Sequence, residues 1–285
     1  MTPTHPMSGM DAFAPNESAE LVRTRGVAKA HSDTLTLLVL SVLAGAFIAL
    51  GAVLSTTIAT GSTLGLGPTR WLAGVGFSLG LVLVVVAGAE LFTGNNLMVM
   101  AVASGRVRVS RLLRSWVLVY LGNLVGALSV VAMVVLAEWW RGGDLAVGAT
   151  ALSTAAVKTA LPFWVVFFRA ILANALVCLA VWLATGGRTV LDKVVAIVFP
   201  ISAFVAAGFE HSVANMYFVP VGIALKGQAD VVVASGLPPQ ALASLDAGGF
   251  ASNLAAATLG NIVGGAVLVG LVYWFAYLRP GRDQT

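Results

Sequence analysis

Two glutamates lie inside long apolar stretches of the sequence, and one of them is followed directly by a histidine. Glu210 and His211 stand in "GFEHSVAN" (208–215), and Glu90 stands in "AELFTGNN" (89–96). Ionisable groups are costly inside a bilayer and therefore mark pathways, proton relays or ion pairs. His211 could donate a hydrogen bond to a passing anion, or give a proton to a weak-acid anion. A glutamate there could orient the imidazole, or bind amides freed where a helix breaks.

A Glu210–His211 pair could also serve an intramembrane hydrolase, which is the alternative function of a different class. The apolar segments contain no second histidine, however, and the chain has no adjacent pair of glutamates. Histidine is scarce and the single cysteine is Cys178, so a metal site is not expected. The chain has no nucleotide-binding motif. We therefore expect neither an enzyme nor a bound metal or cofactor.

The composition places these residues in a membrane protein. Hydrophobic residues are 59% of the 285 and charged residues are 10%, against about 45–50% and about 25% in soluble domains. A spanning helix needs about 20 apolar residues. Six segments qualify: 36–59, 71–103, 112–137, 162–185, 194–226 and 251–278. We expect an all-α channel domain over 35–279, between an N-terminal segment (1–34) and a C-terminal tail (280–285).

The basic residues predict the orientation of this domain. With six spans both termini lie on one side, and that side has eleven of the lysines and arginines: Arg23, Arg25, Lys29, Arg106, Arg108, Arg111, Arg114, Arg188, Lys193, Arg279 and Arg282. The other side has four: Arg70, Arg141, Lys158 and Lys226. Cytoplasmic loops are enriched in Lys and Arg, so both termini are expected in the cytoplasm of a multi-pass cell-membrane protein surrounded by lipid. The formal net charge of +4 lies in short loops and does not indicate a nucleic-acid partner.

The two polar interruptions belong to an internal repeat. Glu90 and Asn95 align with Glu210 and Asn215 at an offset of 120 residues. "YLGNLVGAL" (120–128) then matches "TLGNIVGGA" (258–266) at an offset of 138, and a longer loop at about 227–249 accounts for the difference. The motifs could simply allow close helix packing, but two matched pairs in one order favour a duplication. A three-span unit must invert in its second copy, as in many transporters.

The interruptions point to a pathway, because non-helical backbone at membrane depth survives only inside protein or beside a watery cavity. Thr93 lies in the first interruption, where its hydroxyl could face the pathway or bond back to the chain. Lys158 could be a solvated lysine or could attract anions into a vestibule. Since Glu90 has no neighbouring histidine, capping or loop anchoring is the better interpretation for both glutamates. The sequence gives no account of Arg169.

The combination of motifs resembles the formate/nitrite transporter family over residues 35–279. The residues that carry the resemblance are "GFSLGL" (76–81), "AELFTGNN" (89–96), "NALVCLAVW" (174–182), "GFEHSVANM" (208–216) and "LGNIVGG" (259–265). It implies an aquaporin-like protomer of six helices, with helices 2 and 5 broken and one pore in each subunit of a homopentamer. Its substrates would be small monovalent anions, with or without accompanying protons.

The resemblance also implies roles for individual residues. Thr93 and His211 would form a central polar pair, with Glu210 behind the histidine. Asn174 and Asn261 would lie near the central chamber, and Lys158 in the vestibule. Phe77 and Phe204 would form an outer constriction, and Leu81 and Phe92 an inner one. Residues 192–223 look like the formate-channel branch, whereas "ELFTGN" and 158–169 look like the nitrite branch. Formate is favoured; nitrite or hydrosulfide is the alternative within the family.

Overall fold

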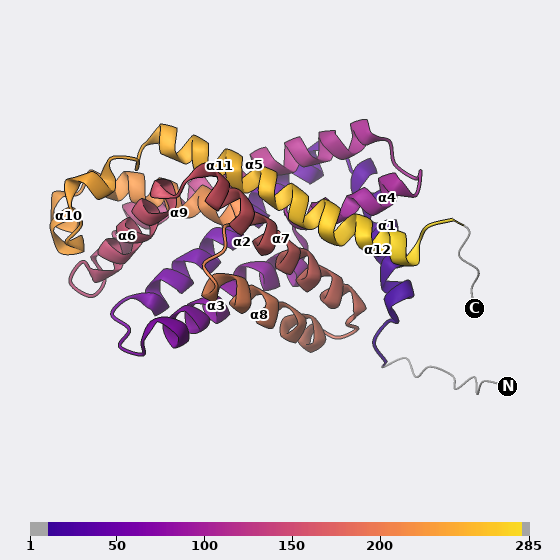
Figure 1. Ribbon diagram of the computed structural model, residues 1–285, viewed down its shortest axis with the longest axis horizontal. Helices are drawn as coiled ribbons and strands as arrows, with labels where there is room; N and C mark the ends of the chain where they lie inside the picture. The colour runs from indigo at the N-terminus through magenta and orange to yellow at the C-terminus, as the bar shows by residue number, and fades with distance from the viewer. Residues whose placement is uncertain (1–10, 281–285) are drawn as a thin grey trace.

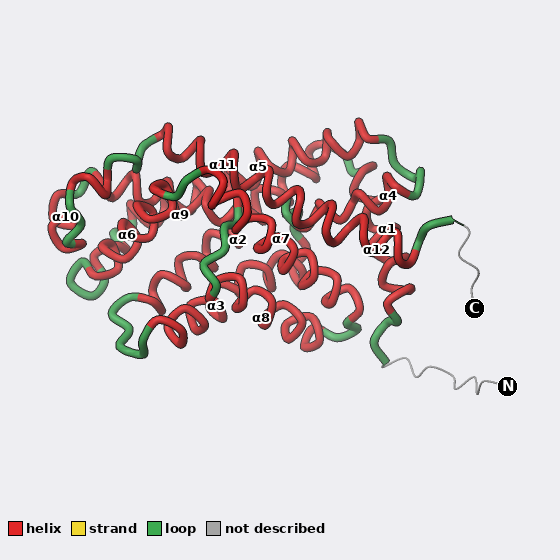
Figure 2. The backbone as a smooth tube through the Cα atoms, viewed as in Figure 1, coloured by secondary structure: helices red, strands yellow, loops and turns green. Residues whose placement is uncertain are grey.

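The computed structural model describes residues 11–280. Two parts of the chain lie outside the described residues: the first ten residues of the predicted N-terminal segment, and residues 281–285 of the predicted tail, which include Arg282. Every regular element within 11–280 is a helix, as Figure 2 shows. The α-helices are α1 (Pro15–His31), α2 (Thr34–Ala59), α3 (Leu66–Val82), α4 (Val99–Ala103), α5 (Val109–Leu136), α6 (Ala146–Ala160), α7 (Phe163–Gly186), α8 (Val190–Ala206), α9 (Ser212–Lys226), α10 (Ala229–Ser235), α11 (Ala247–Ile262) and α12 (Val272–Tyr277).

Shorter 3-10 and π-helical segments link several of these helices. The π-helical segments are Leu83–Gly88, which continues α3, and Val263–Leu271, which joins α11 to α12. The 3-10 segments are Gly94–Met98, Trp139–Arg141 and Pro239–Leu242. The region 227–249, expected as a loop, therefore contains α10 and a 3-10 turn.

Five helical stretches are long and apolar enough to cross a membrane. They are Thr34–Ala59, Leu66–Gly88, Val109–Leu136, Phe163–Gly186 and Ala247–Tyr277. The bent pair α9 and α10, which meet at 110°, would bring the number to six. The chain is therefore a multi-pass membrane protein.

The chain leaves the helical conformation inside both stretches that the sequence marks as interrupted. The residues between Leu83–Gly88 and Gly94–Met98 are not helical, nor are those between α8 and α9. A glycine with positive φ lies where each break begins: Gly88, at 84°, is the last residue before the first break, and Gly208, at 71°, is the second residue after α8. Glycine adopts this left-handed conformation without the steric cost that a Cβ imposes. We refer to residues 89–93 as break 1 and to residues 207–211 as break 2.

Two short surface helices mark opposite ends of the molecule. In Figure 1, α1 lies beside α4 and α12 at one end, whereas α6 and α10 lie at the other end. The first and last described residues lie at the α1 end. Each surface helix packs against the half-helix that follows a break, α1 on α4 and α6 on α9. Each surface helix therefore lies next to the half-helix that follows one of the two breaks.

The start of α2 is set by a side chain. The carboxylate of Asp33 accepts a hydrogen bond of 2.9 Å from the backbone N–H of Thr36. Such a cap satisfies one of the free amides in the first turn of a helix. Hydrogen bonds from the side chain and backbone of Thr36 lower the pKa of Asp33 below its ordinary value. The negative charge at this helix start is thereby favoured.

Glycines allow two helix pairs to pack at backbone contact. A Cβ added to Gly126 on α5 would lie 1.9 Å from the carbonyl oxygen of Val42 on α2. A Cβ added to Gly264, just after α11, would lie 2.1 Å from the carbonyl oxygen of Ile171 on α7. Small residues allow such close packing of membrane helices. These two pairs bring the asparagines described below into reach of the breaks.

We expect Gly126→Ala to lower the thermal unfolding midpoint of the purified protein in detergent. The added methyl would push α2 and α5 apart, at a cost of roughly 1–3 kcal/mol for an overpacked site. Gly67→Ala is the matched control, because a Cβ at Gly67 meets nothing within 4 Å. Equal midpoints for the two variants, measured by intrinsic fluorescence during heating, would contradict the close-packing argument.

Candidate functional site

Break 1 is held by one asparagine. Asn123 on α5 donates from Nδ2 to the carbonyl oxygens of Ser41 at 2.8 Å and Glu90 at 2.9 Å. Its Oδ1 accepts from the backbone N–H of Phe92 at 2.9 Å. The side chain is fully buried, so these bonds satisfy backbone groups that water could not reach. Asn123 thus takes over the bonds that a continuous helix would have made.

Break 2 is held in the same way by Asn261. On α11, its Nδ2 donates to the carbonyl oxygens of Ala170 at 2.8 Å and Glu210 at 3.1 Å. Its Oδ1 accepts from the backbone N–H of Ser212 at 2.8 Å. Asn261 corresponds to Asn123 in the aligned "LGN" motifs, and the three bonds correspond atom by atom. The resemblance placed Asn261 near the chamber; its side chain supports the break.

The glutamate of break 2 forms an ion pair. Glu210 Oε1 and Oε2 lie 3.0 and 3.1 Å from Lys158 Nζ on α6. Oε2 also accepts from Asn215 Nδ2 at 2.7 Å. The Lys158 side chain is only 14% exposed, and its Nζ also lies 5.4 Å from the centre of the Phe218 ring. The charge of Lys158 is therefore largely offset by Glu210.

Break 1 has the same ion pair, which the sequence analysis missed. Glu90 Oε2 lies 3.0 Å from Lys29 Nζ on α1 and accepts from Asn95 Nδ2 at 2.7 Å. Lys29 also donates to Asn95 Oδ1 at 2.7 Å. The signal was present, because Lys29 lies five residues before the first residue of α2, as Lys158 does before α7. The scaffold interpretation of both glutamates agrees with these contacts.

His211 and Thr93 meet between the two breaks. His211 Nε2 lies 2.9 Å from Thr93 Oγ1, and the exposed fractions of the two residues are 2% and 0%. The other ring nitrogen, Nδ1, accepts from the backbone N–H of Ala214 at 3.1 Å, which caps α9. Both ring nitrogens are thus engaged by groups other than Glu210. The Glu210 carboxylate makes no hydrogen bond to the imidazole and is directed instead to Lys158 and Asn215.

These two bonds determine which nitrogen holds the proton. A backbone N–H can only donate, so Nδ1 of His211 must present its lone pair to Ala214. The proton of the neutral ring is then on Nε2, and Nε2–H donates to Thr93 Oγ1. The Thr93 hydroxyl hydrogen is left free to point to another acceptor. A small anion beside this hydroxyl would meet a donor whose oxygen is held in place by His211.

Asn174, the other asparagine that the resemblance places near the central chamber, binds the backbone of Thr93. Asn174 on α7 donates from Nδ2 to the carbonyl oxygens of Thr93 at 3.3 Å and Asn261 at 2.6 Å. Cys178 Sγ lies 3.4 Å from the Thr93 carbonyl oxygen. The backbone of break 1 is therefore tied to α7 and α11 at the threonine that meets His211.

Aromatic rings cover one side of the central pair. Phe77 on α3 and Phe204 on α8 make an edge-to-face contact with ring centres 5.6 Å apart. Phe204 also stacks on the His211 ring at 5.9 Å, and Phe218 stacks on Phe77 at 6.3 Å. Phe77 and Phe204 are 3% exposed. The two rings expected at the outer constriction therefore close against each other beside His211.

A cavity of about 330 Å³ lies on the α1 side of the central pair. Leu81 lines it together with Leu91, whereas Phe92 is absent from its lining. Phe92 instead packs edge-on against Trp116 and Tyr120 of α5, with ring centres 6.0 and 5.0 Å apart. Of the two residues expected at an inner constriction, only Leu81 faces this cavity. Leu91, which the sequence did not single out, also faces the cavity.

The geometry gives no support to hydrolysis by Glu210 and His211. The carboxylate and the imidazole make no hydrogen bond to each other; each binds the other partners described above. Among residues 11–280, moreover, no group of three or more histidine, cysteine or acidic side chains could hold a metal ion. What the arrangement offers is a narrow, buried, hydrogen-bonding point between apolar surfaces.

Comparison with known proteins agrees with this arrangement. The family model described as formate/nitrite transporter matches residues 16–275. The chain is 41% identical over 273 residues to the formate channel FocA of Escherichia coli K12, covering 94% of this chain and 96% of that protein. It is 38% identical over 288 residues to a probable formate transporter of Methanothermobacter thermautotrophicus, covering 95% and 99%.

Solved structures give the same result. A pentameric formate channel with formate bound superposes with a TM-score of 0.80 at 37% identity, over 86% of this chain and 98% of that one. A second structure, an ion channel of the FNT family, has a TM-score of 0.77 at 30% identity, over 91% and 98%. These relatives are channels and transporters, not enzymes. The chain belongs to the formate/nitrite transporter family.

Proposed function

We propose that the chain is a channel for small monovalent anions, with formate as the preferred substrate and one pore in each subunit of a homopentamer. The observation that carries the proposal is the contact between Thr93 and His211, which places two hydrogen-bonding groups alone between apolar walls. The formate channels among the relatives, one of them pentameric, support the choice of substrate and assembly. Nitrite, also a small bent oxyanion, is the second candidate because the matched family is named for both.

The architecture proposed for this pore is a pair of inverted three-span repeats within residues 35–279. The matched bonds of Asn123 and Asn261 support it, as do the matched pairs Lys29–Glu90 and Lys158–Glu210. The two lysines reach the breaks from opposite ends of the molecule, as an inverted repeat requires. Residues 1–34 and 280–285 would lie on the cytoplasmic side of the cell membrane, in agreement with the distribution of basic loop residues.

Passage across the apolar region is governed by desolvation. Transferring a bare anion out of water costs several kcal/mol or more, and Phe77, Phe204 and Leu81 offer it no polar group. Protonation of the anion to its neutral weak acid removes most of this cost. The hydroxyl donor of Thr93 then replaces part of the lost hydration between the apolar surfaces.

In this mechanism His211 is a hydrogen-bond donor and does not supply the proton. If the neutral ring gave up its Nε2 proton, it would become an anion, because Nδ1 is already unprotonated. If the ring were protonated first, the Nδ1 bond that caps α9 would be lost. The proton that travels with the anion therefore comes from water in the vestibules. Lys158 is placed in the outer vestibule, but Glu210 offsets most of its charge.

Thr93→Val should reduce formate uptake into proteoliposomes by about tenfold or more. Valine keeps the shape of threonine but leaves the buried His211 N–H without an acceptor, at a cost of roughly 1–3 kcal/mol, and it removes the donor for the anion. Thr93→Ser keeps the hydroxyl and should retain most of the uptake. If valine and serine variants with equal pentamer yields transport formate at the wild-type rate, the central-site proposal is wrong.

His211→Asn separates hydrogen bonding from proton donation. Asparagine is also a good N-cap, so α9 should keep its start, but the side chain is too short to span the bond to Thr93. We expect slower formate uptake, with the same dependence on external pH as the wild type, because His211 does not supply the proton. If the variant instead lost only the pH-dependent component of uptake, histidine would be the proton donor.

Phe204→Ala should admit larger anions. The substitution opens the contact between Phe77 and Phe204 and should raise acetate uptake relative to formate several-fold. Phe199→Ala is the control, since Phe199 lies on the same helix and is 64% exposed. An unchanged acetate-to-formate ratio in Phe204→Ala would exclude this contact as the constriction. The ratio is read from competition with labelled formate.

A further inference from the structure

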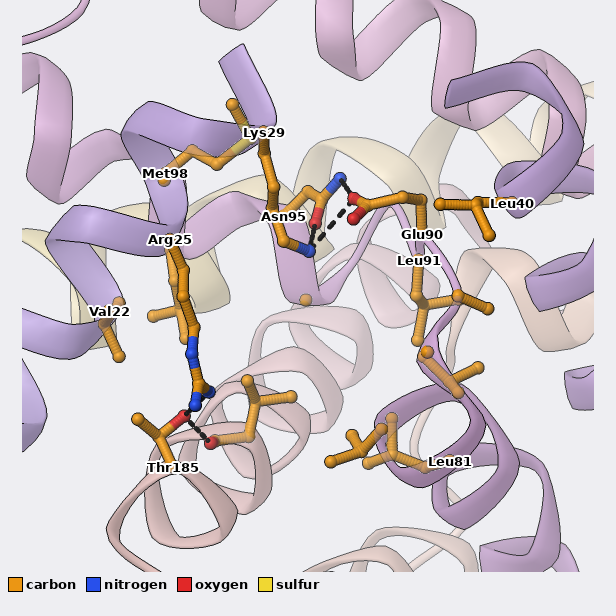
Figure 3. Close-up of a pocket in the computed structure, with 18 residues that line it drawn as sticks. Val22, Arg25, Lys29, Leu40, Leu81, Glu90, Leu91, Asn95, Met98 and Thr185 are labelled. Atoms are coloured by element: carbon orange, nitrogen blue, oxygen red, sulfur yellow. Dashed lines mark hydrogen bonds and ion pairs between the residues drawn. The ribbon is translucent and has the colours of Figure 1, made fainter. Parts of the chain in front are cut away.

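The cavity on the α1 side holds a second cation, Arg25, that the central pathway does not use. Arg25 and Lys29 both line the cavity, one turn apart on α1. Figure 3 shows the Arg25 side chain extending to Thr185 of α7, apart from the group formed by Lys29, Asn95 and Glu90. Leu81 also lines the cavity. The cavity thus leads from two cations to the apolar part of the proposed path.

The two cations differ in how their charge is compensated. Lys29 Nζ is bound to the Glu90 carboxylate and to Asn95 Oδ1. Arg25 makes one hydrogen bond, from Nη1 to Thr185 Oγ1 at 3.1 Å. Within residues 11–280, no carboxylate lies within 4.0 Å of its guanidinium, and the residue is exposed. Arg25 therefore supplies the uncompensated positive charge of this cavity.

Thr185 fixes the orientation of the guanidinium. Its hydroxyl donates to the carbonyl oxygen of Val181, one turn earlier on α7, at 2.9 Å. With its hydrogen used in that bond, the Thr185 oxygen is oriented to accept from Arg25. The remaining N–H groups of the guanidinium stay available in a planar fork. Such a fork matches the two oxygens of a carboxylate with two parallel hydrogen bonds.

We propose that Arg25, oriented by Thr185, is a binding site for a small planar oxyanion at the α1-side mouth of the pore. The ligand class is a small planar anion with two oxygens on one atom, which formate and nitrite share and chloride does not. The site captures the anion from the cytoplasm before it reaches Leu81 and loses its water. This inference rests on the proposed function and adds a specificity-determining residue to it.

The test compares Arg25→Gln with Arg23→Gln in the full-length protein. Arg23 lies two residues earlier on α1, pairs with Glu20 and does not line the cavity. Formate uptake is measured in vesicles oriented so that the α1 side faces the added formate. We expect the half-saturating formate concentration to rise by about three- to tenfold in Arg25→Gln and to stay unchanged in Arg23→Gln. Equal values for the two variants would overturn the proposal.

Two further variants distinguish a binding site from a structural tie between α1 and α7. Arg25→Lys keeps the charge but lacks the fork, so formate should lose its advantage over chloride as a competitor of labelled formate. Thr185→Val frees the guanidinium and should raise the half-saturating concentration less than Arg25→Gln does. If Arg25→Gln and Thr185→Val lower the unfolding midpoint but leave the half-saturating concentration unchanged, Arg25 is a tie only and the proposal is wrong.

Direct binding separates this inference from the proposed function. Saturation-transfer NMR with formate as the probe reports binding to purified protein without any need for transport. If the wild-type protein carries no formate across a bilayer, the proposed function fails, whereas a formate signal weakened by Arg25→Gln would still support the site. If transport is intact and Arg25→Gln leaves both the signal and the half-saturating concentration unchanged, only the Arg25 site is overturned.

Discussion

The central constraint on this protein is that backbone polar groups at membrane depth must find partners within the protein. The helical backbone stops and restarts at breaks 1 and 2, where buried amides and carbonyls have lost their helical partners. Asn123 and Asn261 meet this demand with three hydrogen bonds each. They can do so because glycines such as Gly126 and Gly264 allow the flanking helices to approach to backbone contact.

The ion pairs follow from the same constraint. Burying an unpaired carboxylate at a helix break would carry a large desolvation cost. Each of the two glutamates is therefore paired with a lysine from a surface helix, Glu90 with Lys29 of α1 and Glu210 with Lys158 of α6. The pairing ties α1 and α6 to the breaks and leaves the two lysines largely compensated. Electrostatic attraction of an anion must therefore come from other cations or from oriented dipoles. Arg25 is such a cation on the α1 side.

Much of this scaffold could be predicted from the sequence, because it depends on local signals. Apolar length located five spanning stretches, and the aligned Glu and Asn residues located both breaks. The predicted span 194–226 is divided between α8 and α9, and the possible sixth span is the bent pair α9 and α10. The start of α3 was placed too late, at 71 in place of Leu66, because Gly67, Pro68 and Thr69 lower the apolar average of its first turn. Contacts between distant residues could not be predicted: Arg25 and Thr185 are 160 residues apart. The hydrogen bond from the Ala214 N–H to His211 is short-range, but the sequence does not say which ring nitrogen accepts it.

The repeat alignment also explains why the central site is found where the two halves differ. At the offset of 120 residues that pairs the breaks, His211 corresponds to Leu91 and Thr93 corresponds to Val213. Each half thus contributes one hydrogen-bonding side chain, at a position where the other half has an apolar one. Under the proposed duplication, the paired glutamates and asparagines could be inherited unchanged, since both breaks need the same support. A pathway lined equally by both copies would have had either two histidines, which repel when charged, or none. One histidine bonded to one threonine forms a single neutral chain of hydrogen-bond donors. The chain runs from Nε2–H of His211 to the Thr93 hydroxyl, because the Ala214 N–H already occupies Nδ1 of His211.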